Sequence, residues 1–257
     1  MAQKQRLDIE VHQRGLAPSR EKARGMIMAA EVIVNGKIRD KPGFRVTSED
    51  RIVLKTRPRF VSRGGEKLAG ALKEFSLDVS SLVCADVGAS TGGFTDCLLQ
   101  AGAQKVYAID VGYGQLAYSL RIDDKVVIME RTNARHLVAL PEKVNLVVID
   151  ASFISLKLLI PNVINWLSDN ASIIALIKPQ FEAGKSDVGK GGVVRDTKIH
   201  RRVINELISF FDTVDLHVHG LTVSPIKGPA GNVEFLIWLS QSASNLDVAE
   251  QIDTVIS

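Results

Sequence analysis

Two lysines and two carboxylates occupy positions from which they could transfer a proton. Asp150 follows the apolar run LVVI, and Lys178 follows the apolar run IIALI. Polar residues at the carboxyl ends of parallel strands point into the ligand crevice of an open α/β sheet. A lone Asp or Lys there is more often a capping or solvated residue, but two at adjacent strand ends indicate a site. Lys67 in SRGGEKL and Glu234 in GNVEFLIWL are the other two candidates.

A glycine-rich turn forms the second candidate site. In VCADVGASTGGFTDCLLQAGA an apolar strand is followed by a turn with four glycines or serines and then by a helix, and Asp110 ends the next strand, 22 residues after Gly88. Glycines let the backbone approach a ligand closely, and an acid at the second strand end can hydrogen-bond a ribose hydroxyl. The predicted nucleoside contacts are Asp86, Gly88, Ser90, Gly92, Gly93, Phe94, Asp110 and Asp150. Asn133 is a further candidate for the adenine, although a polar loop explains it equally well.

The nucleoside can belong to either of two cofactors. A dinucleotide site expects GxGxxG, but Ser90 stands where the second glycine lets the pyrophosphate approach. Asp86 would also repel a pyrophosphate, whereas it could order the ammonium group of a methionine moiety. The pattern favours S-adenosylmethionine over a dinucleotide or a purely structural turn.

These residues need a parallel sheet to position them, and strand-like and helical segments do alternate after Ser62. Strands are expected at 82–87, 105–109, 143–149, 172–177, 214–223 and 233–239, with a third strand region before Thr132; helices are expected at 67–75, 95–101, 155–165 and 200–211. The last two strands would pair antiparallel across residues 224–232. This predicts an α/β, Rossmann-like class I methyltransferase sheet, preceded by a small α+β domain.

The N-terminal segment differs from the rest in charge. Residues 1–57 hold 13 Lys/Arg and 7 Asp/Glu, a net charge of +6, whereas residues 58–257 have a net charge of −3. Solvated charges alone could explain this, but a basic segment on a near-neutral body favours a polyanion-binding module. Helices are expected at 6–14 and 20–30, with Ser19 as a cap. A hairpin is expected across Asn35-Gly36, and a closing strand at 51–55.

This pattern resembles the RNA-binding domain first described in small-subunit ribosomal protein S-four. The matching pieces are RLD, SR, VNG, KP and DRI within residues 6–52. The resemblance implies RNA binding, for which our candidates are Arg6, Arg20, Arg24, Lys37 and Lys41, with Arg63 extending the basic surface. TRPRF, residues 56–60, is typical of a linker; we divide the chain into residues 1–57, a linker at 58–61 and residues 62–257.

Lys67, Asp150, Lys178 and Glu234 match the Lys-Asp-Lys-Glu tetrad of FtsJ-like RNA 2′-O-methyltransferases. With VSRGGEKL, DVGASTGGFTD, IDASFISL, IKPQFEAG and GNVEF, the whole chain resembles the TlyA family. The resemblance implies S-adenosylmethionine-dependent methylation of a ribose 2′-hydroxyl, on cytidine in the best-known members, in ribosomal RNA or ribosomal subunits. One departure is Phe60, since the family's linker often carries a tryptophan at that place.

The expected mechanism needs a base for the ribose hydroxyl. An amine can accept that proton when it is uncharged, a form that burial or a neighbouring cation favours. We expect Lys178 to be this base, Lys67 the cation beside it, and Asp150 and Glu234 the groups that orient the lysines. No metal is required. Residues 182–196, rich in glycine, are interpreted as an RNA-contacting lid or a solvated loop; Phe153 and Phe181 can stack on a base or pack in the core.

Other protein classes fit the sequence less well. The two cysteines form no CxxC pair, which argues against a disulfide scaffold or a zinc site. No secretion signal and no apolar run of about 18 residues are present, so we expect a cytoplasmic protein without a membrane segment. A non-catalytic RNA-binding or assembly protein has no need of Lys178. A cytolysin, as the family's old name haemolysin suggests, lacks the membrane-length segment.

Overall fold

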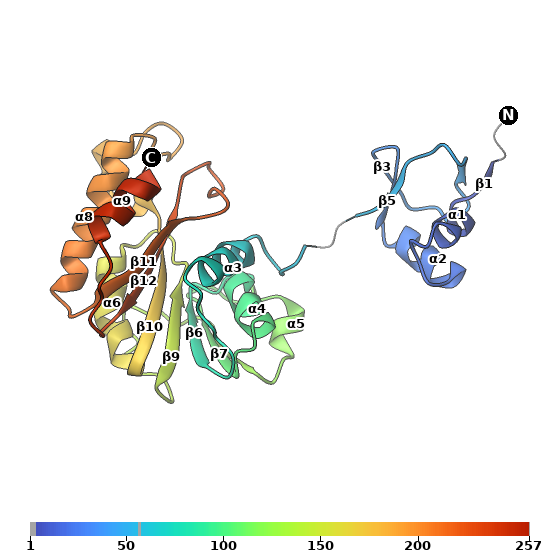
Figure 1. Cartoon of the computed structure of the whole chain (residues 1–257). Helices are drawn as coiled ribbons and strands as arrows, with labels where there is room; N and C mark the ends of the chain where they lie inside the picture. The colour runs from blue at the N-terminus through green and yellow to red at the C-terminus, as the bar shows by residue number, and fades with distance from the viewer. Residues whose placement is uncertain (1–3, 56–57, 257) are drawn as a thin grey trace. The chain divides into compact units, whose positions relative to one another are not determined.

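The computed structural model describes residues 4–55 and 58–256 (Figure 1). Contacts between residues divide the chain into two compact units, residues 1–58 and 59–257. Thr56 and Arg57 of the expected linker lie outside the described residues. Phe60, in contrast, is 3% exposed and packs against Leu68 and Phe94 within the second unit.

Residues 4–55 of the small unit form two helices and five short strands around one apolar cluster. They are β1 (Gln5–Arg6), α1 (Leu7–Gln13), α2 (Arg20–Met28), β2 (Val32–Val34), β3 (Lys37–Arg39), β4 (Arg45–Val46) and β5 (Ile52–Leu54). The expected cap is confirmed, because the Ser19 side chain accepts a hydrogen bond from the Lys22 amide. The expected hairpin is also confirmed: Asn35 and Gly36 both have positive φ, and β2 pairs antiparallel with β3 around them.

The second unit is built on a seven-stranded sheet in the order β11-β12-β10-β9-β6-β7-β8. The strands are β6 (Val83–Val87), β7 (Lys105–Ile109), β8 (Val126–Met129), β9 (Val144–Ile149), β10 (Leu167–Ile177), β11 (His217–Val223) and β12 (Phe235–Ser240). All neighbours from β10 to β8 pair parallel, whereas β12 pairs antiparallel with both β10 and β11. The expected mainly parallel sheet with its closing antiparallel pair is confirmed.

Helices cover both faces of this sheet (Figure 1). They are α3 (Gly64–Glu74), α4 (Gly93–Gln100), α5 (Tyr118–Arg121), α6 (Leu156–Val163), α7 (Pro179–Glu182), α8 (Thr197–Asp212) and α9 (Val248–Ile256), with 3-10 turns at Ile164–Trp166 and Lys185–Asp187. Side chains alternate along the strands, so β9 sends Leu146 and Val148 to the α3–α4 side, and Val147 and Ile149 to the α6–α8 side. The order reverses at β6, which places a ligand crevice beside its carboxyl end.

Several expected boundaries are wrong. The first helix of this unit begins at Gly64 rather than at Lys67, which therefore lies inside it. Glu234 does not lie in the last strand but directly before β12, and β11 begins at His217 rather than at residue 214. β10 begins five residues earlier than expected. The short helices α5 and α7 and the C-terminal α9 were not expected at all.

Candidate active site

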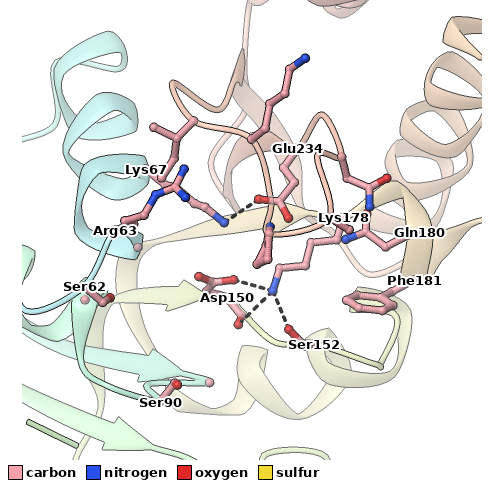
Figure 2. A pocket seen from close by; sticks show the side chains of 18 of the residues that line it. Ser62, Arg63, Lys67, Ser90, Asp150, Ser152, Lys178, Gln180, Phe181 and Glu234 are labelled. Carbon is pink, nitrogen blue, oxygen red and sulfur yellow. Dashed lines mark hydrogen bonds and ion pairs between the residues drawn. The ribbon is translucent and has the colours of Figure 1, made fainter. Parts of the chain in front are cut away.

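A cavity of about 680 Å³ opens at the carboxyl ends of β6, β9 and β10 (Figure 2). All four tetrad residues line it, together with part of the glycine-rich turn and segments of the neighbouring loops. The lining includes Ser62, Arg63, Gly64, Lys67, Gly88, Ala89, Ser90, Gly93, Phe94, Asp150, Ser152, Phe153, Lys178, Gln180, Phe181, Gly191, Gly192, Ile226, Lys227, Pro229, Ala230, Asn232 and Glu234. The volume is in the range of small-molecule sites.

The first ion pair joins two neighbouring strand ends. Asp150 follows β9 and Lys178 follows β10, as expected, and Lys178 Nζ lies 2.6 Å from Asp150 Oδ1. This contact is an ion pair, because the angles at Asp150 Oδ1 do not suit a hydrogen bond. Lys178 Nζ donates a hydrogen bond to Ser152 Oγ instead, at 2.8 Å. Lys178 is 7% exposed, so this ammonium group lies largely out of solvent at the cavity wall.

The second ion pair joins residues that are distant in sequence. Lys67 Nζ on α3 lies 2.5 Å from Glu234 Oε2, and both side chains are buried. Gly228 packs so closely on this carboxylate that a Cβ added there would come 2.5 Å from Glu234 Oε1. Both pairs line the same cavity, and Figure 2 shows the Lys67–Glu234 pair above the Lys178–Asp150 pair.

The glycine-rich turn depends on residues without a Cβ. Gly88 has φ +86°, and a Cβ there would lie 2.8 Å from the backbone oxygen of Asp150. At Gly93 an added Cβ would lie 2.2 Å from Ser62 Oγ, at the amino end of α4. Ser90 also has positive φ, and its amide donates to Asp110 Oδ2 at 2.8 Å. The turn therefore lies tightly between the loop after β9 and the segment before α3.

Asp86 lies behind this turn, on β6. It is fully buried, and its Oδ2 accepts hydrogen bonds from the Thr95 amide at 2.9 Å and the Thr95 hydroxyl at 2.7 Å. Its Oδ1 has no partner among the described residues. Burial, only partly offset by the Thr95 hydrogen bonds, raises the pKa of Asp86 to about 7. A cation near the turn would stabilise its ionised form.

The expected cofactor residues divide into three groups. Gly88, Ser90, Gly93, Phe94 and Asp150 line the main cavity. Asp110 lines a small adjoining hollow with Ala89, Ser90, Ala108, Gly112, Gln115, Leu116, Ile128 and Glu130. Asp86, Gly92 and Asn133 line neither; Asn133 is exposed and accepts a hydrogen bond from the Arg135 amide, which fits the alternative of a polar turn.

Several cavity residues were missed by the sequence analysis. Ser152 and Gln180 belong to the segments that follow β9 and β10, and Ile226, Lys227, Pro229 and Ala230 belong to the turn before Glu234. Gly191 and Gly192 also line the cavity, but they lie within residues 182–196, which were interpreted as a lid or a solvated loop. Ser152 and Gln180 could have been predicted, because each lies two residues after a tetrad residue at a strand end. Phe153 is 89% exposed, with its ring 4.9 Å from that of Phe181, so core packing is not its role.

The expected RNA-binding residues differ in whether their side chains form ion pairs within the protein. Arg6 and Arg20 both pair with the buried Asp8, at 2.9 and 3.0 Å. Burial opposes ionisation of this carboxyl, but the two arginine hydrogen bonds outweigh it and lower the pKa of Asp8. Arg24, Lys37 and Lys41 are exposed on the small unit. Arg63 is exposed at the cavity rim of the second unit.

Residues 4–55 and 58–256 contain neither a candidate membrane span nor a cluster of metal ligands. None of the helices there combines the length and apolar character that a membrane crossing requires. Nor do three or more His, Cys, Asp or Glu side chains gather there as metal ligands.

Comparisons with known proteins agree with this architecture. Residues 60–241 match the FtsJ-like methyltransferase family, and residues 5–52 match the S4 domain. The chain is 46% identical over 243 residues to the 16S/23S rRNA (cytidine-2′-O)-methyltransferase TlyA of Mycobacterium tuberculosis, covering 93% of this chain and 91% of the relative. It is 43% identical over 234 residues to Hemolysin A of Brachyspira hyodysenteriae, covering 90% and 98%.

A solved structure described as "Putative hemolysin from Streptococcus thermophilus" covers 100% of this chain and 95% of its own, with 41% identity and a TM-score of 0.75. The matched domains thus occur together in relatives of nearly equal length. The chain belongs to the TlyA family of FtsJ-like methyltransferases that carry an N-terminal S4 domain.

Proposed function

We propose that this protein transfers the methyl group of S-adenosylmethionine to a ribose 2′-hydroxyl in ribosomal RNA. The observation that carries the proposal is the pairing of Lys178 with Asp150 and of Lys67 with Glu234 on one cavity, beside the glycine-rich turn. Two lysine–carboxylate pairs at one site suit the movement of a proton, whereas a binding surface has no need of buried ion pairs.

The residues present fit S-adenosylmethionine. Gly88 and Gly93 let the turn pack closely on Asp150 and Ser62 at the cavity wall, and Asp110, in the small hollow at the end of β7, is the proposed partner of a ribose hydroxyl. The unpaired Oδ1 of Asp86 lies behind the turn, where a positively charged ligand would offset its burial. When bound, the cofactor supplies an electrophilic methyl carbon on a sulfonium.

Lys178 is the proposed base. After releasing a proton to solvent, the Lys178 amine would take the proton of the ribose hydroxyl, whose oxygen would bond to the methyl carbon. The cofactor would supply that carbon and leave as a neutral thioether. Asp150 and Ser152 hold that amine in place. The Lys67–Glu234 pair is proposed to help position the ribose hydroxyl beside it. Alignment of hydroxyl and methyl group supplies much of the rate.

The small basic unit supports RNA as the substrate. Its matched S4 domain, its net charge of +6 over residues 1–57 and its exposed basic residues suit phosphate contacts. The relative from M. tuberculosis is named for cytidine-2′-O methylation of 16S and 23S rRNA. We therefore propose cytidine in ribosomal RNA, free or within ribosomal subunits, as the target.

Two other functions have less support. A non-catalytic assembly protein would not need both buried ion pairs. A cytolytic role rests only on the names of relatives, such as Hemolysin A and putative hemolysin, whereas the described residues assemble a cavity lined by both lysine–carboxylate pairs.

Methyl transfer to RNA tests the proposal directly. The purified protein is incubated with tritiated S-adenosylmethionine and bacterial ribosomal RNA or subunits, and the nucleosides are then separated by mass. We expect a 2′-O-methylated nucleoside, cytidine in the first instance. Base methylation would contradict the 2′-hydroxyl, and absence of transfer to all these substrates would contradict the function.

A further inference from the structure

Asn232 connects two loops of the cavity wall through its side chain. It is 2% exposed, its Oδ1 accepts a hydrogen bond from the Val194 amide at 2.9 Å, and its Nδ2 donates to the Gly192 carbonyl at 2.9 Å. A neighbouring strand would normally form the hydrogen bonds to the Val194 amide and the Gly192 carbonyl. Here one amide side chain satisfies both, so residue 232 needs both a donor and an acceptor.

The first loop is short and is anchored near its end. Gly189 and Val193 form an isolated antiparallel bridge, so residues 189–193 turn back on themselves. Val194 is then held on both sides, because its amide donates to Asn232 and its carbonyl is 3.1 Å from His200 Nε2 on α8. Gly191 and Gly192, at the tip, line the cavity.

The second loop leads directly to a tetrad residue. The carbonyl of Asn232 accepts a hydrogen bond from the Gly228 amide at 2.9 Å, and Gly228 packs on the carboxylate of Glu234. Glu234 lies two residues after Asn232 and pairs with Lys67. The same residue thus holds the 189–194 loop and closes the turn that surrounds Glu234.

We infer that Asn232 is a positioning residue, which clamps the 189–194 loop to the Glu234 turn and thereby holds the RNA-facing wall of the cavity in register with the Lys67–Glu234 pair. The inference rests on the proposed function as far as rate is concerned. The clamp itself is a structural claim about Val194 and can be measured without methyl transfer.

Two variants separate positioning from simple loss of structure. Asn232→Ala removes both hydrogen bonds, whereas Asn232→Asp keeps the acceptor for Val194 and loses the donor for Gly192 when ionised. We expect kcat with ribosomal RNA to fall about tenfold or more in both, since misplaced groups cost rate steeply. Affinity for S-adenosylmethionine should stay within about twofold, because the side-chain hydrogen bonds of Asn232 go to Gly192 and Val194 and not to the Gly88–Gly93 turn or Asp110.

The pH dependence of kcat in Asn232→Asp tests whether restoring the lost donor restores the rate. The carboxyl that Asn232→Asp introduces can, once protonated, again donate to Gly192 and accept from Val194. The rate of Asn232→Asp relative to wild type should therefore rise as the pH falls from 8.5 to 6. The rate of Asn232→Ala relative to wild type should not. Asn205→Asp, a change at an exposed position of α8, is the matched control and should show neither effect.

Hydrogen exchange at the Val194 amide completes the test. It should exchange faster in Asn232→Ala than in wild type, and by a larger factor than the amide of Val147 at the centre of β9, which reports on the stability of the whole unit. Unchanged Val194 exchange together with normal kcat and KM would overturn the inference. If wild type transfers no methyl group, the proposed function fails, and Val194 exchange alone still decides for or against the clamp.

Discussion

Lys178 donates a hydrogen bond to the Ser152 hydroxyl, with 2.8 Å between Nζ and Oγ. Ser152 lies two residues after Asp150, whose carboxylate is 2.6 Å from the same Nζ. The amine therefore extends from the end of β10 but is held by the loop that follows β9. A general base must lie within hydrogen-bond distance of the proton that it accepts. The contacts with Ser152 and Asp150 therefore determine where the Lys178 amine can accept the hydroxyl proton.

Replacing Ser152 with Ala should slow methyl transfer without weakening cofactor binding. A hydrogen bond to a charged group contributes about 1.5–3 kcal/mol, so we expect kcat to fall about tenfold. Single-turnover rates at saturating RNA and S-adenosylmethionine measure this. Ser186→Ala, an exposed change in the neighbouring loop, is the control. Equal rates for the two variants would show that Ser152 does not position Lys178.

Asp86 should make stability depend on pH. Its pKa is raised from 3.8 to about 7 in the folded protein, so its contribution to stability is complete below pH 3.8 and is lost as the pH rises toward 7. Asp86→Asn removes this loss. The variant should therefore gain at least about 1 kcal/mol in the free energy of unfolding relative to wild type between pH 4 and pH 7.

Urea unfolding of the ligand-free protein at several pH values tests this. Asp78→Asn is the control, because hydrogen bonds from Ser80 lower the pKa of the exposed Asp78. Parallel stability curves for wild type and Asp86→Asn would contradict the prediction.

Phe153 should contribute to RNA binding and not to stability. It is 89% exposed, has φ +64°, and lines the cavity with Phe181. Stacking on a base contributes about 1–3 kcal/mol, so Phe153→Ala should raise KM for RNA at least about fivefold. The melting temperature should not fall. Val138→Ala, which removes an exposed apolar side chain away from the cavity, should leave KM unchanged.

Arg24 should contact phosphate without supporting the fold. It is exposed on α2, whereas Arg20 on the same helix is paired with Asp8. Arg24→Ala should weaken RNA binding and reduce the slope of log K against log salt by about one. The control is Lys125→Ala. Lys125 directly precedes the amino end of β8 and so lies at the end of the sheet opposite the cavity. An unchanged salt slope would remove Arg24 from the RNA surface.

The sequence predicted the parts of the site that follow from local patterns. Asp150 and Lys178 end continuous apolar strands, and parallel pairing of β9 with β10 brings such ends together. The Asn35-Gly36 hairpin likewise follows from two residues that tolerate positive φ. β8 was less visible, because this edge strand is only half-buried along its length and its side chains show no clear alternation.

Other features depend on contacts between distant segments. Lys67 and Glu234 are separated by 167 residues, and their pairing needs α3 and the turn before β12 to meet. The 189–194 loop is held in part by two hydrogen bonds to the Asn232 side chain, a contact that no local sequence pattern reveals. Phe153 is exposed and has a positive φ, a conformation that bulky residues rarely adopt and that its neighbours in the sequence do not predict.

The single-turnover rate of Lys178→Met with RNA and S-adenosylmethionine both saturating tests the central claim most directly. The variant keeps much of the side-chain stem and removes the amine that faces Asp150 and Ser152. General-base catalysis contributes about 100-fold or more, so methyl transfer should slow at least that far while cofactor affinity changes little. A near-normal rate in this variant would contradict Lys178 as the base, and loss of cofactor binding together with the rate would make it a cofactor-holding residue instead.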